Sequence, residues 1–285
     1  EFVLENKLQA FQVGIDALAK LTTGKVHLSV KGKGKSIFKD VKGVSLHQVY
    51  GPHPAGNVGV QIGKISPINA GERVWTVTPQ DVATIGELFL TGKFNATRTV
   101  ALVGSEVKDA QYYNVISGAS IADLVAGKIE GDNVRVISGD VLTGTKVKMD
   151  GNLGFLSNTV TVIPEGNVYR MFGWMPFASP SVHSASRTGL SWLMPGKKYA
   201  PNTNLNGEER ALVVTGEMEA VMPLDIFPMQ LLKACLASDI DKMESLGIYE
   251  VAPEDFALID YTNTSKLEAQ QIIREALDLM IKEVG

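Results

Sequence analysis

Residues 221–285 read VMPLDIFPMQLLKACLASDIDKMESLGIYEVAPEDFALIDYTNTSKLEAQQIIREALDLMIKEVG, with apolar side chains at helical spacing. Prolines stand where new helices would begin, as is common at the first helical position. The last helix is expected to take Thr264 or Ser265 as its N-cap. Its inward-facing residues would be Leu267, Ile272, Ile273, Leu277 and Met280. We therefore predict a C-terminal helical domain over residues 223–285.

This region also contains Cys235, which is the only cysteine of the chain. A protein-bound iron–sulfur cluster is normally held by several thiolates at short spacing, so one cysteine cannot build such a site. A single cysteine also excludes an intramolecular disulfide and fits a reducing compartment. We expect no iron–sulfur centre within this chain.

Before the helical region, residues 151–222 predict a β-rich segment. Strands are expected at 158–164, 167–174 and 210–216, where β-branched and aromatic residues gather. Residues 176–209 lie between the last two strands and are rich in Ser, Pro, Gly and Asn. A loop of this length is either functional or locally mobile.

Residues 98–150 predict a small β-rich domain with one helix. The helix follows Ser120, whose side chain is suited to cap it. The expected strands are TVALVG (99–104), YYNV (112–115) and VRVIS (134–138). This order is compatible with a β-grasp fold, in which a curled sheet covers a short helix.

Residues 1–97 predict part of an α/β layer domain. Short strands are expected at 26–30 and 46–50, and a first helix is indicated by Leu4, Leu8, Phe11, Ile15 and Leu18. A second helix would begin after Thr78 and end before Gly92. The chain opens directly on a helix pattern without an initiator methionine, so we expect it to be cut from a longer protein.

The composition excludes several classes of protein. With 45% hydrophobic and 20% charged residues, the 285-residue chain resembles ordinary soluble globular proteins of two or three domains. Its net charge of −4 gives no broad basic field, so nucleic acid is not an expected partner. No run approaches the roughly 18 to 20 apolar residues that a membrane span requires.

Two motifs for nucleotide binding are absent or incomplete. Gly34, Lys35 and Ser36 resemble the end of a phosphate loop, but Ser29 stands where that motif requires its first glycine. Solvated lysines in a turn explain these residues better. No dinucleotide-binding glycine fingerprint follows any strand.

The four histidines, His27, His47, His53 and His183, do not stand at metal-ligand spacing from one another or from the cysteine. We therefore predict no metal site. His53 differs from the others because it lies between two prolines in GPHPAG (51–56), just past a strand end. Ligands and partners bind at that edge of α/β sheets, but two prolines also fix a turn with no ligand at all.

The long loop carries apolar and aromatic residues, among them Phe177 and Trp192. If exposed, they would serve docking to a partner or a lipid-like molecule; folded back, they would form a small satellite core. No catalytic triad, Cys–His pair or spaced acid pair is present. The candidate quinone or partner contacts are His53, Pro54, Phe177 and Trp192, with no catalytic and no cofactor-binding residue.

Several collinear blocks resemble a known family, the A subunit (NqrA) of the bacterial sodium-translocating NADH:quinone oxidoreductase. The blocks are FQVGIDALAKLTTGKV (11–26), VYGPHPAGNVG (49–59), VRVISGDVLTGT (134–145), VYRMFGW (168–174), VMPLDIFPMQLLKACLASDID (221–241), LGIYEVAPEDFAL (246–258) and TSKLEAQQIIREALDLMIKEVG (264–285). A long N-terminal portion of the family is absent. The family is itself similar to the C subunit of the Rnf complexes and, distantly, to the flavin- and NADH-binding subunit of complex I.

The resemblance implies a partial Rossmann-like domain, then a β-grasp domain of the soluble-ligand-binding type (SLBB), then a helical domain. It does not extend to cofactor ligands. The complex I relative holds a cluster through Cys-x-x-Cys-x-x-Cys, whereas Asn263 stands here where many A subunits show a lone cysteine. GPHPAGNVG and TPQDV (78–82) likewise replace the flavin contacts of that relative.

Two functions follow as expectations. The first is a cofactor-free peripheral subunit on the cytoplasmic face of the bacterial inner membrane. It would dock on the other subunits, chiefly the membrane subunit, and could help to shape a quinone site during NADH-to-ubiquinone electron transfer coupled to sodium export. The complex's FAD, FMN, riboflavin, iron–sulfur centres and ubiquinone would lie in those other subunits. The rival is a module whose SLBB domain binds a small soluble molecule without a redox role.

Overall fold

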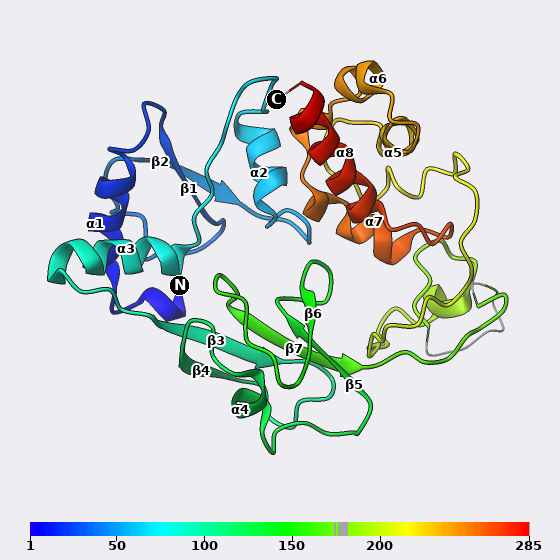
Figure 1. Cartoon of the computed structure of the whole chain (residues 1–285), viewed down its shortest axis with the longest axis horizontal. Coiled ribbons are helices and arrows are strands. Elements are labelled where there is room, and N and C mark those ends of the chain that lie inside the picture. Colours follow the sequence, from blue (N-terminus) through cyan, green and yellow to red (C-terminus); the bar gives the residue numbers. More distant parts are fainter. Residues whose placement is uncertain (174, 176–181, 285) are drawn as a thin grey trace.

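The computed structural model describes residues 1–173, 175 and 182–284. Figure 1 shows three units around a common centre: an α/β unit on the left, a five-stranded sheet below and a helical unit on the right. Each unit has its own cluster of buried hydrophobic residues. Among the residues described, no helix combines the length and apolar composition that crossing a membrane requires. The coarse prediction of a mixed α/β fold is confirmed.

The α/β unit contains a parallel pair of strands and three helices. In chain order its elements are η1 (Phe2–Leu4), α1 (Leu8–Leu18), β1 (Val26–Lys31), β2 (Val44–Val49), α2 (Val58–Ile65) and α3 (Pro79–Thr91). The second predicted helix is confirmed, because the Thr78 side chain accepts the Asp81 amide and Gly92 ends the helix in the left-handed region. Helix α2 was not predicted, because its glycines lower its helix propensity.

Two glycines let α1 and α3 cross with their backbones in contact. A Cβ added to Gly86 would lie 2.6 Å from the carbonyl carbon of Ala10 and nearer still to its oxygen. A Cβ added to Gly14 would lie 2.9 Å from the carbonyl carbon of Val82. The core beside this crossing contains Phe11 and Phe38, whose ring centroids are 4.9 Å apart. The helix pair therefore depends on the absence of a side chain at both crossing positions.

The central sheet has the strand order β4-β3-β7-β5-β6. Its strands are β3 (Thr97–Val103), β4 (Gln111–Ile116), β5 (Val134–Ser138), β6 (Thr145–Val147) and β7 (Thr159–Pro164). One short helix, α4 (Ile121–Val125), contributes Ile121 and Leu124 to the core, and the Ser120 side chain caps it as predicted. Because β7 pairs in parallel with β3 and antiparallel with β5, the sheet extends to residue 164, past the expected domain end at 150.

The β-rich prediction for residues 151–222 was wrong beyond β7. The described residues from 165 to 227 contain one short 3-10 helix, η2 (Leu190–Leu193), and no strand, so the strands expected at 167–174 and 210–216 do not form there. Backbone donors at the start of this segment bond to side chains instead of to a ladder. The Gly166 amide bonds to Thr203 Oγ1 at 2.7 Å, and the Val168 amide bonds to Asn204 Oδ1 at 2.9 Å.

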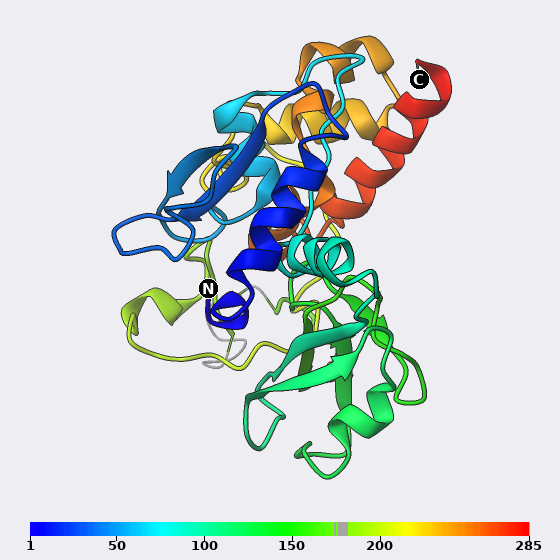
Figure 2. The same ribbon diagram turned by 90° about the vertical axis from the view of Figure 1, so that its left-hand side faces the viewer.

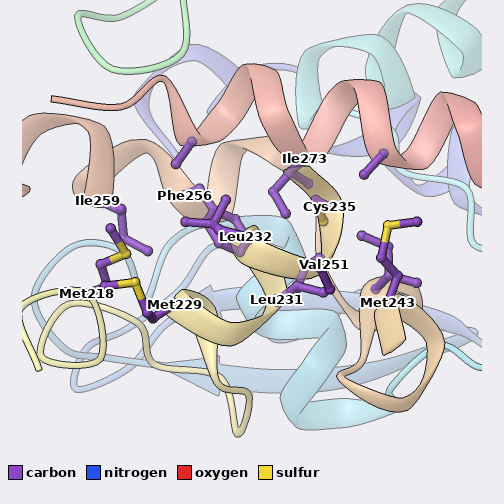
Figure 3. Close-up of a cluster of buried hydrophobic side chains, with 14 of the residues drawn as sticks. Met218, Met229, Leu231, Leu232, Cys235, Met243, Val251, Phe256, Ile259 and Ile273 are labelled. Carbon is purple, nitrogen blue, oxygen red and sulfur yellow. The ribbon is translucent and has the colours of Figure 1, made fainter. Parts of the chain in front are cut away.

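The helical unit packs around a core rich in methionine and leucine (Figure 3). Its elements are α5 (Pro228–Leu236), α6 (Ile240–Ser245), η3 (Ile248–Glu250), η4 (Pro253–Phe256), α7 (Ala257–Thr262) and α8 (Ala269–Glu283). Cys235 is buried in this core, and burial raises the pKa of its thiol to about 11. Ile273 and Met280 of α8 are buried as predicted.

The predicted cap of the last helix was wrong. The helix begins at Ala269, and Asp260 of α7 accepts the Ala269 amide at 2.5 Å. Thr264 instead bonds to Glu217, through both its amide and its hydroxyl group. A carboxylate from a neighbouring helix thus supplies the capping oxygen that was expected from Thr264 or Ser265.

Asn263 closes the turn between α7 and α8. It is fully buried, its amide nitrogen donates to the Ile259 carbonyl at 2.7 Å, and its amide oxygen accepts the Leu267 amide at 3.2 Å. Both polar ends of the side chain are therefore used inside the protein. Asn263 is a structural hydrogen-bonding residue of this turn.

Two polar joints attach the sheet to its neighbours. Gln80 in the first turn of α3 exchanges two hydrogen bonds with the backbone of Thr99 in β3, at 2.9 and 3.0 Å. On the other side, the Gln270 side chain of α8 donates to the Leu142 carbonyl, in the loop after β5, at 3.0 Å. The sheet is thus tied to both flanking units by side-chain amides that bond to backbone.

Candidate functional site

A hollow with a volume of about 550 Å³ lies against the sheet. Its floor is formed by the end of β3, by alternate residues along β7 and by the loop after β5, and residues 198–201 form its outer wall. Apolar side chains share the lining with polar ones: Val103, Val141, Ile163, Ala200 and Pro201 with Ser105, Asp140, Thr159, Thr161, Lys198 and Tyr199. This volume falls in the range typical of small-molecule sites.

Asp140 at the rim of the hollow stabilises the loop after β5 through hydrogen bonds to its carboxylate. One carboxylate oxygen accepts the amides of Leu142 and Thr143 at 2.7 and 2.9 Å, and the other accepts the Thr143 hydroxyl at 2.8 Å. Burial alone would raise the pKa of this carboxyl, but the three hydrogen bonds and the nearby charge of His53 lower it. Asp140 is therefore ionised at neutral pH, and the loop is held in shape without a ligand.

The contact residues predicted from the sequence differ in their exposure to solvent. His53 is exposed and does not line the hollow, although its coulombic interaction helps to lower the pKa of Asp140, which does. Pro54 is buried beside it. Trp192 is exposed in η2 but does not line the hollow, and Phe177 lies outside the described residues. None of the three predicted contact residues that the structure describes lines the hollow; the long loop contributes residues 198–201 to it instead.

Sequence reasoning missed the aromatic residues that fix the outer wall. The His183 ring stacks on Tyr261 of α7, with centroids 5.9 Å apart, and its Nδ1 lies 3.3 Å from the Tyr261 hydroxyl. The edge of Tyr199 meets the same imidazole at a centroid distance of 5.4 Å. No periodic signal marks these three residues, because they come from an irregular loop and from a helix that are far apart in sequence.

Tyr199 also carries a buried polar atom that has no partner among the described residues. Its hydroxyl oxygen is buried and makes no hydrogen bond with any residue that the structure describes. A buried hydroxyl in this state costs about 1–3 kcal/mol. An acceptor atom brought within hydrogen-bonding distance of this hydroxyl would recover that cost.

A second hollow, of about 200 Å³, lies where α3 meets β3. Its main polar groups are already paired: Arg98 is buried, binds Asp81 at 2.5 Å, and also donates to the Phe155 carbonyl. Gln80 is used by the backbone of β3. This hollow therefore belongs to the joint between two units and offers a ligand little to bind.

Two other features bear on metal chemistry. Within residues 1–173, 175 and 182–284, no cluster of three or more His, Cys, Asp or Glu residues could hold a metal ion. His27 and His47, which the sequence did not associate, meet across β1 and β2 with Nδ1 and Nε2 2.9 Å apart. Their rings are nearly parallel, at 19°. The pair forms a hydrogen bond between imidazoles on neighbouring strands.

Comparison with known families gives two matches that follow one another along the chain. Residues 1–94 match the model described as the NqrA second alpha/beta domain, and residues 99–149 match the model described as the NQRA C-terminal domain. Together the two matches cover the α/β unit and most of the sheet unit.

Curated relatives extend the similarity to nearly the whole chain. They are the A subunits of Na(+)-translocating NADH-quinone reductases. The chain is 36% identical over 282 residues to the protein from Neisseria meningitidis serogroup B, and 38% identical over 285 residues to that from Serratia proteamaculans. Each alignment covers 99% of this chain and 63% of the relative. The corresponding protein from Klebsiella pneumoniae is 38% identical over 275 residues, which is 96% of this chain and 61% of the relative.

Proposed function

We propose a function from one premise: the chain belongs to the NqrA family, as the collinear sequence blocks indicated and the family matches confirm. On this premise, the chain is part of an A subunit of a Na(+)-translocating NADH:quinone oxidoreductase. The observation that carries the proposal is similarity along nearly the entire chain to proteins of that name. The chain spans about 63% of the length of those relatives, so their activity and partners come to it only as part of this proposal.

In this proposal the chain binds no redox cofactor of its own. FAD, FMN, riboflavin, iron–sulfur centres and ubiquinone would be handled by other subunits while electrons pass from NADH to quinone. Two properties of Cys235 support this part. It is the only thiol, and burial raises its pKa to about 11, so the thiolate needed to bind iron is disfavoured.

The purified chain provides the test of this part. Its absorbance spectrum is expected to show protein bands only, and acid extraction should release no flavin. A stoichiometric flavin or iron–sulfur chromophore would contradict the proposal. Cys235→Ser is the matched variant, because an iron-dependent band that survived this substitution would show that the ligands are not thiolates.

We further propose that the chain is peripheral, at the cytoplasmic face of a bacterial inner membrane, and docks on the membrane subunit. His53 and Trp192 are the proposed contacts, supported by the exposure of both side chains. The test is co-purification with the other subunits. His53→Ala and Trp192→Ala are expected to weaken association, whereas His27→Ala and Trp75→Ala replace exposed residues of the same types elsewhere and should not.

A quinone contact is proposed at the hollow that Tyr199 lines. A quinone has carbonyl oxygens on its ring, which would accept a hydrogen bond from the Tyr199 hydroxyl. Its apolar tail would suit the apolar part of the lining. A short-chain ubiquinone analogue should raise the melting temperature of the chain, and less so with Tyr199→Phe. An unchanged melting temperature at saturating analogue would remove quinone from this hollow.

The same hollow supports a second candidate function, the binding of a small soluble molecule by the sheet domain. Its volume of about 550 Å³ and mixed lining favour this function. Thermal-shift screening with nucleotides, cobalamin-like ligands and quinone analogues separates the two candidates. Tight binding of a soluble ligand favours the second function, and stabilisation by quinone analogues alone favours the first.

The finer fold names also belong to this proposal. A partial Rossmann-like fold for the α/β unit is supported by the parallel pairing of β1 with β2. A β-grasp fold for the sheet unit is supported by the mixed five-stranded sheet packed on α4. Superposition on an experimental structure of an NqrA protein is the test of both names.

A further inference from the structure

The net charge of −4 conceals a strong separation of charge along the chain. Residues 20–42 contain seven lysines, one aspartate and no arginine. Residues 223–285 contain twelve acidic residues against five lysines and arginines. In Figure 1 the first segment belongs to the α/β unit on the left and the second forms the helical unit on the right, so the two charges occupy opposite sides of the molecule. Figure 2 shows the molecule from the side of the α/β unit.

The basic segment, residues 20–42, has its lysines in solvent. All seven, which are Lys20, Lys25, Lys31, Lys33, Lys35, Lys39 and Lys42, are exposed. None of them forms an ion pair with any residue in the described part of the chain. The segment comprises the end of the α1 region, β1 and most of the crossover to β2. This arrangement leaves an uncompensated positive patch on an otherwise acidic protein.

We propose that the basic segment docks the protein on the surface of an anionic lipid bilayer. Lysines near such a surface each contribute about 1 kcal/mol of attraction, and the effect falls off within a Debye length. Charge complementarity also orients the molecule, because the acidic helical unit on the far side is repelled by the same surface.

Two details favour a bilayer over nucleic acid as the anionic partner. Leu21, next to Lys20, is 83% exposed, and an aliphatic side chain gains by entering the acyl boundary of a membrane. The segment also lacks arginine, the residue that clamps phosphates and guanine bases with two hydrogen bonds. Flexible lysine point charges suit a diffuse anionic surface better than a defined array of bases.

This inference goes beyond the proposed function and does not depend on it. Membership in the oxidoreductase complex is tested by co-purification with other subunits, whereas lipid binding is tested with the isolated chain and vesicles. The chain could pass either test and fail the other.

Co-sedimentation with vesicles tests the proposal. The chain should bind vesicles containing phosphatidylglycerol, bind those of pure phosphatidylcholine far less, and be released by added salt. Replacing four lysines of the segment by glutamine should weaken binding by at least about 100-fold, since each contributes about fivefold. The variant is Lys25→Gln, Lys31→Gln, Lys35→Gln and Lys39→Gln, which avoids Lys33 because its ammonium lies over the Tyr50 ring.

A matched variant removes the same charge elsewhere. Lys64→Gln, Lys93→Gln, Lys148→Gln and Lys233→Gln replace four exposed lysines from separate parts of the chain, and this variant should bind anionic vesicles nearly as well as the parent. Circular dichroism verifies that both variants fold. The proposal would be overturned if both variants lost vesicle binding equally. It would also be overturned if the parent failed to bind anionic vesicles or bound neutral vesicles equally well. Tighter binding to an oligonucleotide than to anionic vesicles at the same ionic strength would identify nucleic acid as the partner and also overturn it.

Discussion

Gly59 of α2 lies directly against the carboxylate of Asp255 in η4: a Cβ added to Gly59 would stand 2.7 Å from Oδ1 and closer still to Oδ2. Asp255 is 2% exposed, and its Oδ2 accepts the Ala252 amide at 3.0 Å. Burial is the main cause that raises the pKa of this carboxyl. The α/β unit and the helical unit therefore meet at a buried acid that leaves no room for a side chain.

Gly59→Ala is expected to destabilise the chain by about 1–3 kcal/mol, because the new methyl group overlaps a carboxylate that η4 holds in place. Chemical denaturation with a probe in the helical unit measures the change. Gly56→Ala is the control, since a Cβ there meets nothing within 4 Å. Equal stabilities of the two variants would mean that α2 can move away from Asp255 without cost.

Gly86→Ala tests the crossing of α1 and α3. In an exposed helix this substitution would stabilise by about 1 kcal/mol through helix propensity. Here we expect net destabilisation by about 2 kcal/mol or more, because the methyl group would overlap the Ala10 backbone, which cannot rotate aside as a side chain would. A melting temperature at or above that of the parent would contradict this assignment.

Glu165 should make stability depend on pH. Hydrogen bonds from Arg135, with further ones from Thr203 and Lys146, lower the pKa of Glu165 from 4.5 to about 2. Because the pKa is lower in the folded state, the ionised carboxylate stabilises above pH 4.5, and this contribution is lost as the pH falls towards about 2.

The expected result is that Glu165→Gln melts below the parent at neutral pH and that the difference shrinks on acidification through that window. Thermal unfolding followed across pH provides the measurement. Glu130→Gln replaces an exposed glutamate, and its melting temperature should change with pH in the same way as that of the parent. If the difference in melting temperature between Glu165→Gln and the parent stayed constant with pH, the ion pair would contribute nothing to stability.

Tyr199→Phe separates stability from binding at the large hollow. Removing a buried hydroxyl that has no described partner should raise the free energy of unfolding by about 1 kcal/mol. The same substitution should weaken any ligand that accepts a hydrogen bond from it. Tyr112→Phe, at an exposed tyrosine, should change neither quantity. A loss of stability in Tyr199→Phe would indicate that the hydroxyl has a structural partner, such as water.

The sequence could predict elements whose signals are local. Thr78 and Ser120 cap their helices as their side chains suggest, and the strands at 26–30 and 134–138 form because alternating apolar residues meet a nearby core. The last helix was placed too early because its cap, Asp260, comes from another helix. Local patterns carry no information about a hydrogen bond supplied across a turn.

The residues that line the hollow could not be predicted for the same reason. His53 stood out in the sequence because two prolines flank it, but it does not line the hollow, and its role as a contact stays a prediction. Tyr199 and Tyr261 are 62 residues apart in numbering and come together only when the loop folds onto α7, so no spacing rule relates them. Similarly, the strand-like run at 210–216 joins no sheet and leaves Val213 and Val214 exposed.

The three separate hydrophobic clusters have a practical consequence for spectroscopy. Trp75 and Trp192 both face solvent, so intrinsic indole emission from them would barely register the melting of any core. A damaged unit could lose its order while its neighbours kept theirs and the emission stayed flat. Methyl resonances assigned separately to Ile15, Val160 and Ile273 would give each core its own reporter.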